Sequence, residues 1–148
     1  MRILGIDYGE KRIGLAVSDP TGTLARPVET LAVKGGQAGA VSLVIDAIAR
    51  LERDDDPIET IVMGLPRRLD GTANHQTPRV EAFAELLKKR CARPIVLQDE
   101  RLTSHAADGL LAEREPDWRE RKKRLDAAAA AVILQEYLDG RSALGVRR

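Results

Sequence analysis

Apolar residues alternate with small or polar residues near the N-terminus, and this pattern predicts two short antiparallel strands. The first covers Ile3–Asp7 and the second covers Ile13–Ser18, where every other residue is a large aliphatic one. Gly9 lies in the connection between them and supplies the backbone freedom that a tight turn needs. Leu24–Val33 is a third candidate, but it contains Pro27, which lacks a backbone N–H, so we expect an edge strand or a broken strand.

Farther along the chain, helical and strand-like patterns alternate. Apolar residues at helical spacing predict two helices, apolar runs predict two strands, and an alanine-rich segment predicts a final helix. In chain order these elements are the helix Gln37–Arg53, the strand Ile58–Leu65, the helix from about Pro78 to Arg90, the strand Ile95–Gln98 and the helix Leu125–Leu138. Strands that alternate with helices are expected to run parallel, so the sequence predicts an α/β fold in which a mixed five-stranded sheet is flanked by helices.

A polar and highly charged stretch separates the last predicted strand from the final helix. Ser104 is a suitable N-cap for a short helix that continues through Leu111. The segment Glu113–Arg124 is rich in charge and contains Pro116, and it is predicted to be a loop. The final helix is therefore expected to begin just after this loop and to end near Gly140, a residue type common at helix C-termini.

Length and composition indicate a soluble globular protein with one core. The 148 residues suit a single domain, expected over residues 1–140, followed by a C-terminal tail over residues 141–148. Apolar residues make up 43% and charged residues 32% of the chain, which is ordinary for this class. No apolar run approaches the ~20 residues of a membrane span, and Asp7 and Glu10 interrupt any core of a signal peptide. We therefore expect a cytoplasmic protein with no membrane partner.

Cysteine content, charge and aromatic content narrow the possible chemistry. Cys91 is the single cysteine, which excludes an internal disulfide and argues against a cysteine-based zinc site. The net charge is +1, so any attraction to nucleic acid has to come from local basic patches. Aromatic residues make up only 3% of the chain, which disfavours single-strand binding by a base-stacking platform.

Three acidic residues occupy positions at which their side chains can converge. Asp7 ends the first strand, Glu100 follows the last strand with Asp99 beside it, and Asp126 opens the final helix at the head of its apolar face. Together they would form an oxygen-only site for Mg²⁺ or Mn²⁺. Two such ions about 4 Å apart can activate water and stabilise the leaving oxygen in phosphodiester cleavage. Ordinary roles remain open, because an Asp such as Asp7 is common in turns and one such as Asp126 is favourable near a helix N-terminus. Asp99 is the alternative to Glu100 as the third acid.

Basic residues near these acids are candidates for binding nucleic-acid phosphate. The densest basic cluster, Arg119–Arg124, directly precedes Asp126, although a solvated loop is its alternative interpretation. His75 and His105 are expected to be solvated or capping residues rather than metal ligands. The candidate phosphate-binding residues are Arg67, Arg68, Arg101, Lys122, Lys123 and Arg124.

Several motifs occur along the chain in the same order as in a known family. They are Gly5-Ile6-Asp7-Tyr8-Gly9, Ala16-Val17-Ser18-Asp19, Gly64-Leu65-Pro66 with Asp70-Gly71, Asp99-Glu100-Arg101-Leu102-Thr103-Ser104, and Lys122-Lys123-Arg124-Leu125-Asp126 with Ala128-Ala129 and Ile133-Leu134-Gln135. With these motifs the chain resembles the YqgF family, also called RuvX-like, from about Met1 to Gly140. It departs from the family pattern at Arg67-Arg68, where many relatives carry smaller or apolar residues, and this departure concerns substrate details.

The resemblance implies a ribonuclease H-like fold and a cytoplasmic nuclease, a hydrolase of the two-metal endonuclease type. Members are described as a Holliday junction resolvase and as the nuclease that matures the 5′ end of 16S rRNA from its precursor. By position, Asp7, Glu100 and Asp126 match the catalytic acids of the family. The expected function is therefore cleavage of precursor 16S rRNA in ribosome biogenesis, with Mg²⁺ or Mn²⁺ as cofactor.

Alternatives to this function remain open from the sequence. The first is a Holliday junction resolvase in DNA recombination and repair, which would be favoured by a symmetric dimer; we expect a monomer or a weak dimer. The second is a non-catalytic nucleic-acid-binding module on the same fold. A sugar kinase or actin-like ATPase begins with a similar strand, Asp-x-Gly and hairpin, but it needs two related domains and a far longer chain.

Overall fold

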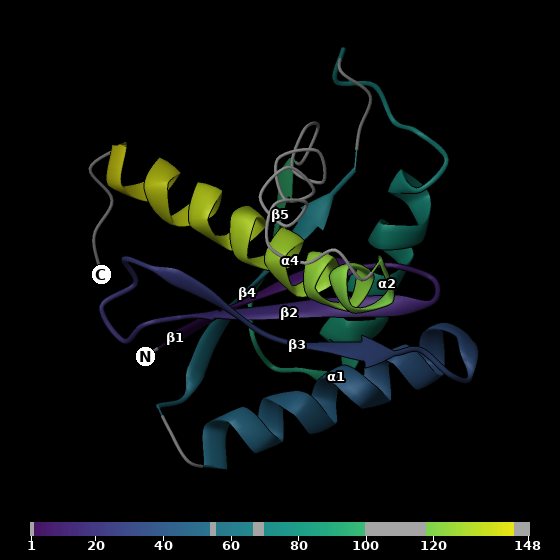
Figure 1. Ribbon diagram of the computed structural model, residues 1–148, viewed down its shortest axis with the longest axis horizontal. Coiled ribbons are helices and arrows are strands. Elements are labelled where there is room, and N and C mark those ends of the chain that lie inside the picture. Colours follow the sequence, from purple (N-terminus) through teal and green to yellow (C-terminus); the bar gives the residue numbers. More distant parts are fainter. Residues whose placement is uncertain (1, 54–55, 67–69, 100–117, 144–148) are drawn as a thin grey trace.

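The structure is a computed structural model that describes residues 2–53, 56–66, 70–99 and 118–143 (Figure 1). Its strands are β1 (Arg2–Tyr8), β2 (Arg12–Ser18), β3 (Ala25–Ala32), β4 (Ile58–Leu65) and β5 (Ile95–Asp99). They form one sheet in the order β3-β2-β1-β4-β5. β2 is antiparallel to both β1 and β3, whereas β4 is parallel to both β1 and β5. The predicted mixed five-stranded sheet is therefore confirmed.

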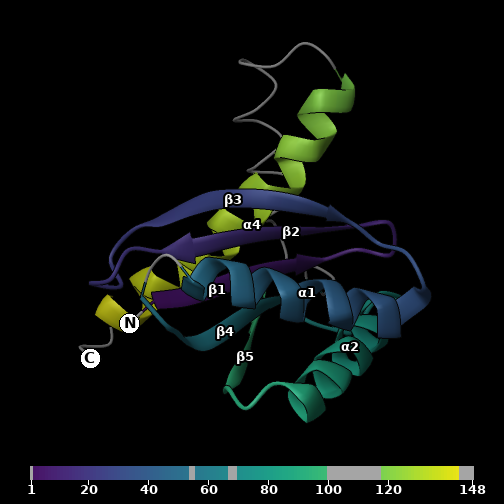
Figure 2. The same cartoon turned by 90° about the horizontal axis from the view of Figure 1, so that it is seen from below.

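Helices cover both faces of the sheet (Figure 2). They are α1 (Gly36–Arg53), α2 (Thr77–Arg90) and α4 (Trp118–Ala143). α1 and α2 lie on one face, where they enclose the larger apolar core, and α4 crosses the other face over a smaller core. None of the helices in the described ranges is long and apolar enough to cross a membrane.

The third strand lies where the proline in its sequence predicts. β3 forms an edge of the sheet and pairs only with β2. The pairing shifts register between Leu15 and Ala16, which lie opposite Glu29 and Pro27 respectively. A proline cannot donate to the ladder, so an edge position beside an irregular pair is where a strand tolerates it.

The final helix is longer than the sequence predicts at both ends. α4 begins at Trp118, so residues 118–124, predicted to be a loop, are helical. Arg, Lys and Glu are nearly as favourable in helices as Leu, so the charge of this segment did not indicate a loop. Gly140, near which the helix was predicted to end, lies inside the helix, which continues to Ala143 and thus into the predicted tail. The predicted helix Ser104–Leu111 lies outside the described residues.

Two glycines let α4 lie directly on the backbone of the sheet. A Cβ atom on Gly14 of β2 would lie 1.8 Å from the backbone oxygen of Asp126. A Cβ atom on Gly5 of β1 would lie 2.8 Å from the Cβ of Leu134 and 3.0 Å from the backbone oxygen of Ala130. The distances of 1.8 Å and 2.8 Å are shorter than real Cβ contacts, so a side chain at either position would force α4 or its neighbours to shift.

Hydrogen bonds from Gln135 fix α4 along its own axis. Its side-chain oxygen accepts a hydrogen bond from the backbone N–H of Ala25 at 2.9 Å, and its side-chain nitrogen donates to the backbone oxygen of Thr23 at 3.0 Å. The amide thereby pairs with both a donor and an acceptor at the start of β3. Together with the glycine contacts, it determines which residues of α4 face the sheet.

We expect Gly14→Ala to lower the free energy of unfolding by roughly 3 kcal/mol, because the added methyl group forces α4 away from β2. Gly140→Ala is the matched control: it adds the same methyl group to an exposed helical position with no atom within 4 Å. This control should raise stability by about 0.5–1 kcal/mol. Urea denaturation followed by circular dichroism measures both, and equal effects of the two substitutions would contradict the close packing described here.

Candidate active site

The fold brings Asp7 and Asp126 together. Asp7 lies near the end of β1 and pairs with Gly14 of β2. Residues opposite each other on antiparallel strands project from the same face of the sheet. The face of Gly14 is in contact with the backbone of Asp126 in α4. The two predicted catalytic acids therefore share one place, although they lie near opposite ends of the chain.

The position of Asp126 within α4 rules out one ordinary role for it. The sequence placed this residue at the start of the final helix, where it could have served as a partner of the helix dipole. α4 begins at Trp118, more than two turns earlier. The dipole effect is confined to the first turn of a helix, so that interpretation of Asp126 is wrong.

Burial and charge make Asp7 an unusual carboxyl group. The side chain is only partly exposed, and its burial raises the pKa from 3.8 to about 7, with the negative charge of Asp126 adding to the rise. Near neutral pH this carboxyl group therefore holds a proton far more often than an ordinary aspartate does. A carboxyl group held this way favours a proton, or a cation in its place.

Arg12 forms an ion pair with Asp126 that sequence reasoning missed. Its Nε donates to Oδ2 of Asp126 at 2.6 Å, and the two side chains are 30% and 23% exposed. Arg12 begins β2 two residues before Gly14, so it projects from the same sheet face. The same alternation of side chains by which the sequence predicted β2 therefore places Arg12 on the face that α4 covers.

These residues suit a hard cation. Asp7 and Asp126 supply carboxylate oxygens, the donors that Mg²⁺ and Mn²⁺ prefer. Within the part of the chain that the structure describes, no three His, Cys, Asp or Glu side chains are grouped closely enough to hold a metal ion. The third predicted ligand, Glu100, lies outside the described residues. Asp99 ends β5. Because β1, β4 and β5 are parallel, Asp99 and Asp7 both lie at the carboxyl ends of these strands.

Most of the predicted phosphate-binding residues cannot be placed at the site. Those outside the described residues are Arg67, Arg68 and Arg101, together with His105. The backbone of Lys122, Lys123 and Arg124 lies in the first two turns of α4, before Asp126, and their side chains are outside the described part. The basic cluster thus lies on a helix rather than on the predicted loop.

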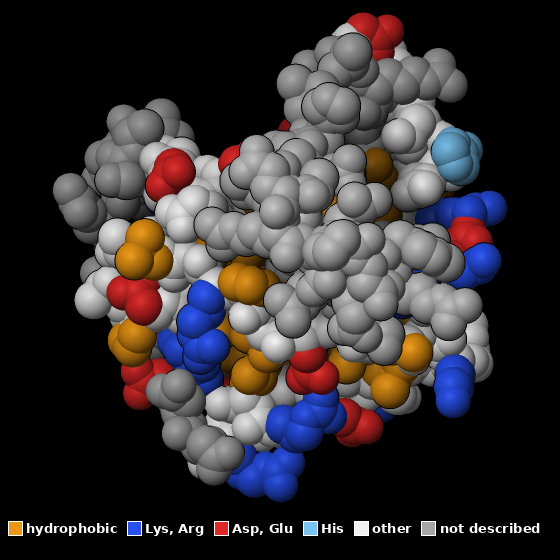
Figure 3. All heavy atoms as spheres, viewed as in Figure 1, with side chains coloured by type: hydrophobic (Ala, Val, Ile, Leu, Met, Phe, Trp, Pro, Cys, Tyr) orange, Lys and Arg blue, Asp and Glu red, His pale blue; other side chains and the backbone are white. Residues whose placement is uncertain are grey.

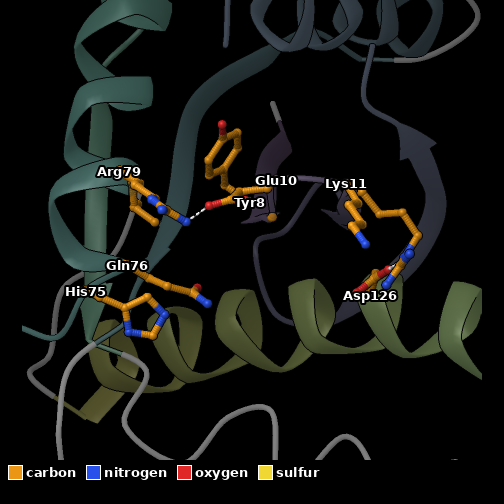
Figure 4. A pocket seen from close by; sticks show the side chains of 10 residues that line it. Tyr8, Glu10, Lys11, His75, Gln76, Arg79 and Asp126 are labelled. Carbon is orange, nitrogen blue, oxygen red and sulfur yellow. Dashed lines mark hydrogen bonds and ion pairs between the residues drawn. The ribbon is translucent and has the colours of Figure 1, made fainter. Parts of the chain in front are cut away.

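A pocket of about 400 Å³ opens beside Asp126 (Figure 4). The connection between β1 and β2, the start of α2 and the side of α4 form its walls. Its lining residues are Tyr8, Gly9, Glu10, Lys11, Arg12, His75, Gln76, Arg79, Val80 and Asp126. Sequence reasoning did not select Lys11 or Arg79, and it interpreted His75 as solvated. The structure shows His75 exposed, but on the wall of this pocket.

Packing holds the α2 wall of this pocket in place. The ring of Tyr8, at the end of β1, stacks on Phe83 of α2 with centroids 4.3 Å apart and planes 18° apart. At the start of α2, the buried hydroxyl of Thr77 donates to the backbone oxygen of Pro66 and accepts from the backbone N–H of Asn74. α2 is therefore anchored to β1 through Phe83 and, at its start, to the residue that follows β4.

Comparison with known proteins identifies the family. Residues 1–140 match the family described as "RuvX: Holliday junction resolvase". The chain belongs to this family. A relative from Lactobacillus johnsonii is 40% identical over 94% of this chain and 96% of its own length, and one from a Geobacillus strain is 37% identical over 95% and 99%. Both carry the name "Putative pre-16S rRNA nuclease".

Solved structures show the same fold. RuvC of Thermus thermophilus, in complex with a Holliday junction substrate, matches with a TM-score of 0.58 and 14% identity, covering 100% of this chain and 98% of that one. The Holliday junction resolvase of fowlpox virus matches with a TM-score of 0.53 and 13% identity, covering 95% and 99%. The fold is ribonuclease H-like, as the sequence resemblance implied.

The raised pKa of Asp7 predicts how stability depends on pH. The unfolded chain releases this proton near pH 3.8, whereas the folded protein releases it near pH 7. Between these values the folded state holds the extra proton, so stability falls as the pH rises through this window. We expect the titration of Asp7 to lower the free energy of unfolding across this window by an amount on the order of 2–4 kcal/mol. Asp7→Asn should remove this decrease.

Urea denaturation at several pH values from about 4 to 8 measures this fall. Asp46→Asn is the charge-matched control, because it removes an exposed carboxylate from α1 and leaves Asp7 in place. The control should retain the pH dependence of the wild type. If Asp7→Asn retained it too, the carboxyl group of Asp7 would not be the one that burial affects.

Proposed function

We propose that this protein is a metal-dependent endonuclease that hydrolyses phosphodiester bonds of precursor 16S rRNA at its 5′ end. The observation that carries the proposal is the convergence of Asp7 and Asp126 on one face of the sheet. Membership in the RuvX family and relatives with the name of a precursor rRNA nuclease support the type of reaction and the substrate. A cytoplasmic location and a role in ribosome biogenesis belong to the same proposal.

In this proposal Asp7, Asp126 and Glu100 hold Mg²⁺ or Mn²⁺, and the two-metal arrangement is the form we favour. When bound, the ions supply activation of water and neutralise the charge that develops on the leaving oxygen. The protein's own residues prepare the site. Asp7 has to give up its proton before it can act as a ligand, and Arg12 orients the carboxylate of Asp126 through the 2.6 Å hydrogen bond.

Basic residues around the acids are proposed to hold the substrate. Arg67, Arg68 and Arg101 would form the rim, and the start of α4 would contribute Lys122, Lys123 and Arg124. Phosphate contacts of this kind set the position of a nucleic acid without reading its sequence. The proposed enzyme acts as a monomer or as a weak dimer.

Resolution of Holliday junctions is the second candidate function. It is favoured by the description of the family and by the fold shared with two resolvases. Symmetric cutting of a junction needs two active sites, so this function would require a stable symmetric dimer. A side-by-side assay on precursor 16S rRNA and on a four-way DNA junction separates the two functions.

We expect Asp7→Asn to lower the cleavage rate by at least ~100-fold, the size of effect seen when the surroundings of a metal are disturbed. Added Mg²⁺ or Mn²⁺ should raise the unfolding temperature of the wild type more than that of Asp7→Asn, because the ion binds the folded state. Asp46→Asn is again the control with an unaltered site. Equal thermal shifts together with retained cleavage would contradict the metal-nuclease proposal and favour a non-catalytic binding module.

We expect alanine at positions 122, 123 and 124 together to weaken substrate binding and to flatten its salt dependence. Consecutive helical positions are about 100° apart, so all three cannot face one strand of nucleic acid. The log–log salt slope should therefore change by about 1–2 rather than 3. Binding to catalytically impaired Asp7→Asn, measured by fluorescence anisotropy at several salt concentrations, gives the slope. An unchanged slope would mean that this cluster does not contact phosphate.

A further inference from the structure

We propose that the pocket beside Asp126 is a subsite for one nucleotide of the substrate strand next to the bond that is cut, with Lys11 and Arg79 binding its phosphate. This inference rests on the proposed nuclease function and deepens it. The pocket shares Asp126 with the acidic pair, but its basic residues Lys11, Arg12 and Arg79 are not among the basic positions that the sequence indicated. Its volume of about 400 Å³ falls within the range of pockets that hold a small molecule.

The position of the pocket relative to the acids supports a substrate subsite. Asp126 belongs both to the acidic pair and to the wall of the pocket, so a group in the pocket lies directly beside the proposed reaction centre. Figure 4 shows the side chains of Gln76 and Arg79 on one side of the space and those of Lys11 and Asp126 on the other. A strand with its scissile phosphate at the acids therefore places a neighbouring nucleotide between these walls.

The charges of the pocket suit a phosphodiester. Lys11, Arg12 and Arg79 bring three positive groups, and two of these are already paired within the protein. Arg12 binds Asp126, whereas Arg79 forms an ion pair with Glu10 in which both side chains are more than half exposed. An exposed ion pair contributes little stability, so Arg79 can exchange the carboxylate of Glu10 for a phosphate at small cost. Figure 3 shows basic side chains flanking an acidic one beside a histidine at this edge of the molecule.

A second pocket extends the first and indicates a strand rather than a free nucleotide. It has a volume of about 370 Å³, and it shares Tyr8, Glu10 and Arg79 with the first pocket. Gly36 and Gln37 at the start of α1 complete its lining. The ion pair between Glu10 and Arg79 therefore stands where the two spaces meet. A strand leaving the reaction centre would pass this ion pair, and a phosphate there would meet Arg79.

Binding measurements on the Asp7→Asn protein test the proposal without cleavage. The probe is a fluorescent single-stranded oligonucleotide with the sequence around the cleavage position, prepared as RNA and as DNA. We expect Lys11→Ala and Arg79→Ala each to weaken binding about three- to fivefold and to lower the salt slope by about 0.7. Glu10→Gln should strengthen binding about two- to fivefold, because it frees Arg79 and removes a negative charge. Lys89→Ala, at the far end of the same helix as Arg79, is the control and should bind like the parent.

Shortening the oligonucleotide locates the contact. Nucleotides are removed one at a time from each side of the cleavage position. The effect of Arg79→Ala should disappear when the nucleotide that occupies the pocket is removed, because a substitution and a deletion that act on one contact are not additive. An effect of Arg79→Ala that persists through every truncation would overturn the subsite and would mean a general effect of charge.

Steady-state cleavage by the otherwise unaltered enzyme separates this proposal from the proposed function. Lys11→Ala and Arg79→Ala should raise KM more than they lower kcat, as expected for contacts made equally in the ground and transition states. If the wild type cleaves and these variants bind and cleave like Lys89→Ala, the subsite is wrong and the nuclease function stands. If the variants weaken binding but the wild type cleaves neither RNA nor DNA, the pocket binds nucleic acid and the nuclease function is wrong. If a mononucleotide displaced the fluorescent probe as strongly as the unlabelled oligonucleotide does, the proposed path of the strand through both pockets would be wrong.

Discussion

The direct contact between α4 and the backbone of β1 and β2 is the constraint on which the site depends. Gly5 and Gly14 contribute no side chain of their own where the helix approaches the sheet most closely, and the hydrogen bonds of Gln135 fix the helix along its axis. Gly14 also pairs with Asp7 in the sheet. Asp126, whose backbone contacts Gly14, therefore lies beside Asp7. The packing at Gly14 therefore determines how close Asp126 lies to Asp7. The same contacts stabilise the fold and assemble the candidate site.

The two acids are balanced in different ways. Burial raises the pKa of Asp7 to about 7, so that a proton offsets its charge, whereas the guanidinium of Arg12 offsets that of Asp126. Crowded carboxylates are unfavourable unless a positive charge accompanies them. The fold thus holds two carboxyl groups close together without a cation. A bound cation would reduce the repulsion between them further. A cation that bound here, as proposed, would do so in a pH-dependent way, because a proton would compete with it for Asp7.

Local pattern was sufficient for most of the fold and insufficient for much of the site. Ile58–Leu65 was predicted to the residue, because an apolar run bounded by Pro57 and Pro66 depends only on near neighbours. The start of α4 was missed, because charge and a nearby proline were taken to indicate a loop while helix propensity favoured the opposite. Arg12 and Arg79 were missed for another reason: their roles arise only when distant elements meet.

The placement of α4 also has a consequence for the life of the protein on the ribosome. Asp7 emerges from the ribosome well before its partner Asp126, because α4 follows all five strands of the sheet in the sequence. Until then the face of β1 and β2 that carries Gly5 and Gly14 has no helix to cover it. A nascent chain, or a chain shortened before α4, therefore has one acid of the pair and lacks the candidate site. The two acids can meet only after α4 has been synthesised, so the order of synthesis delays assembly of the candidate site.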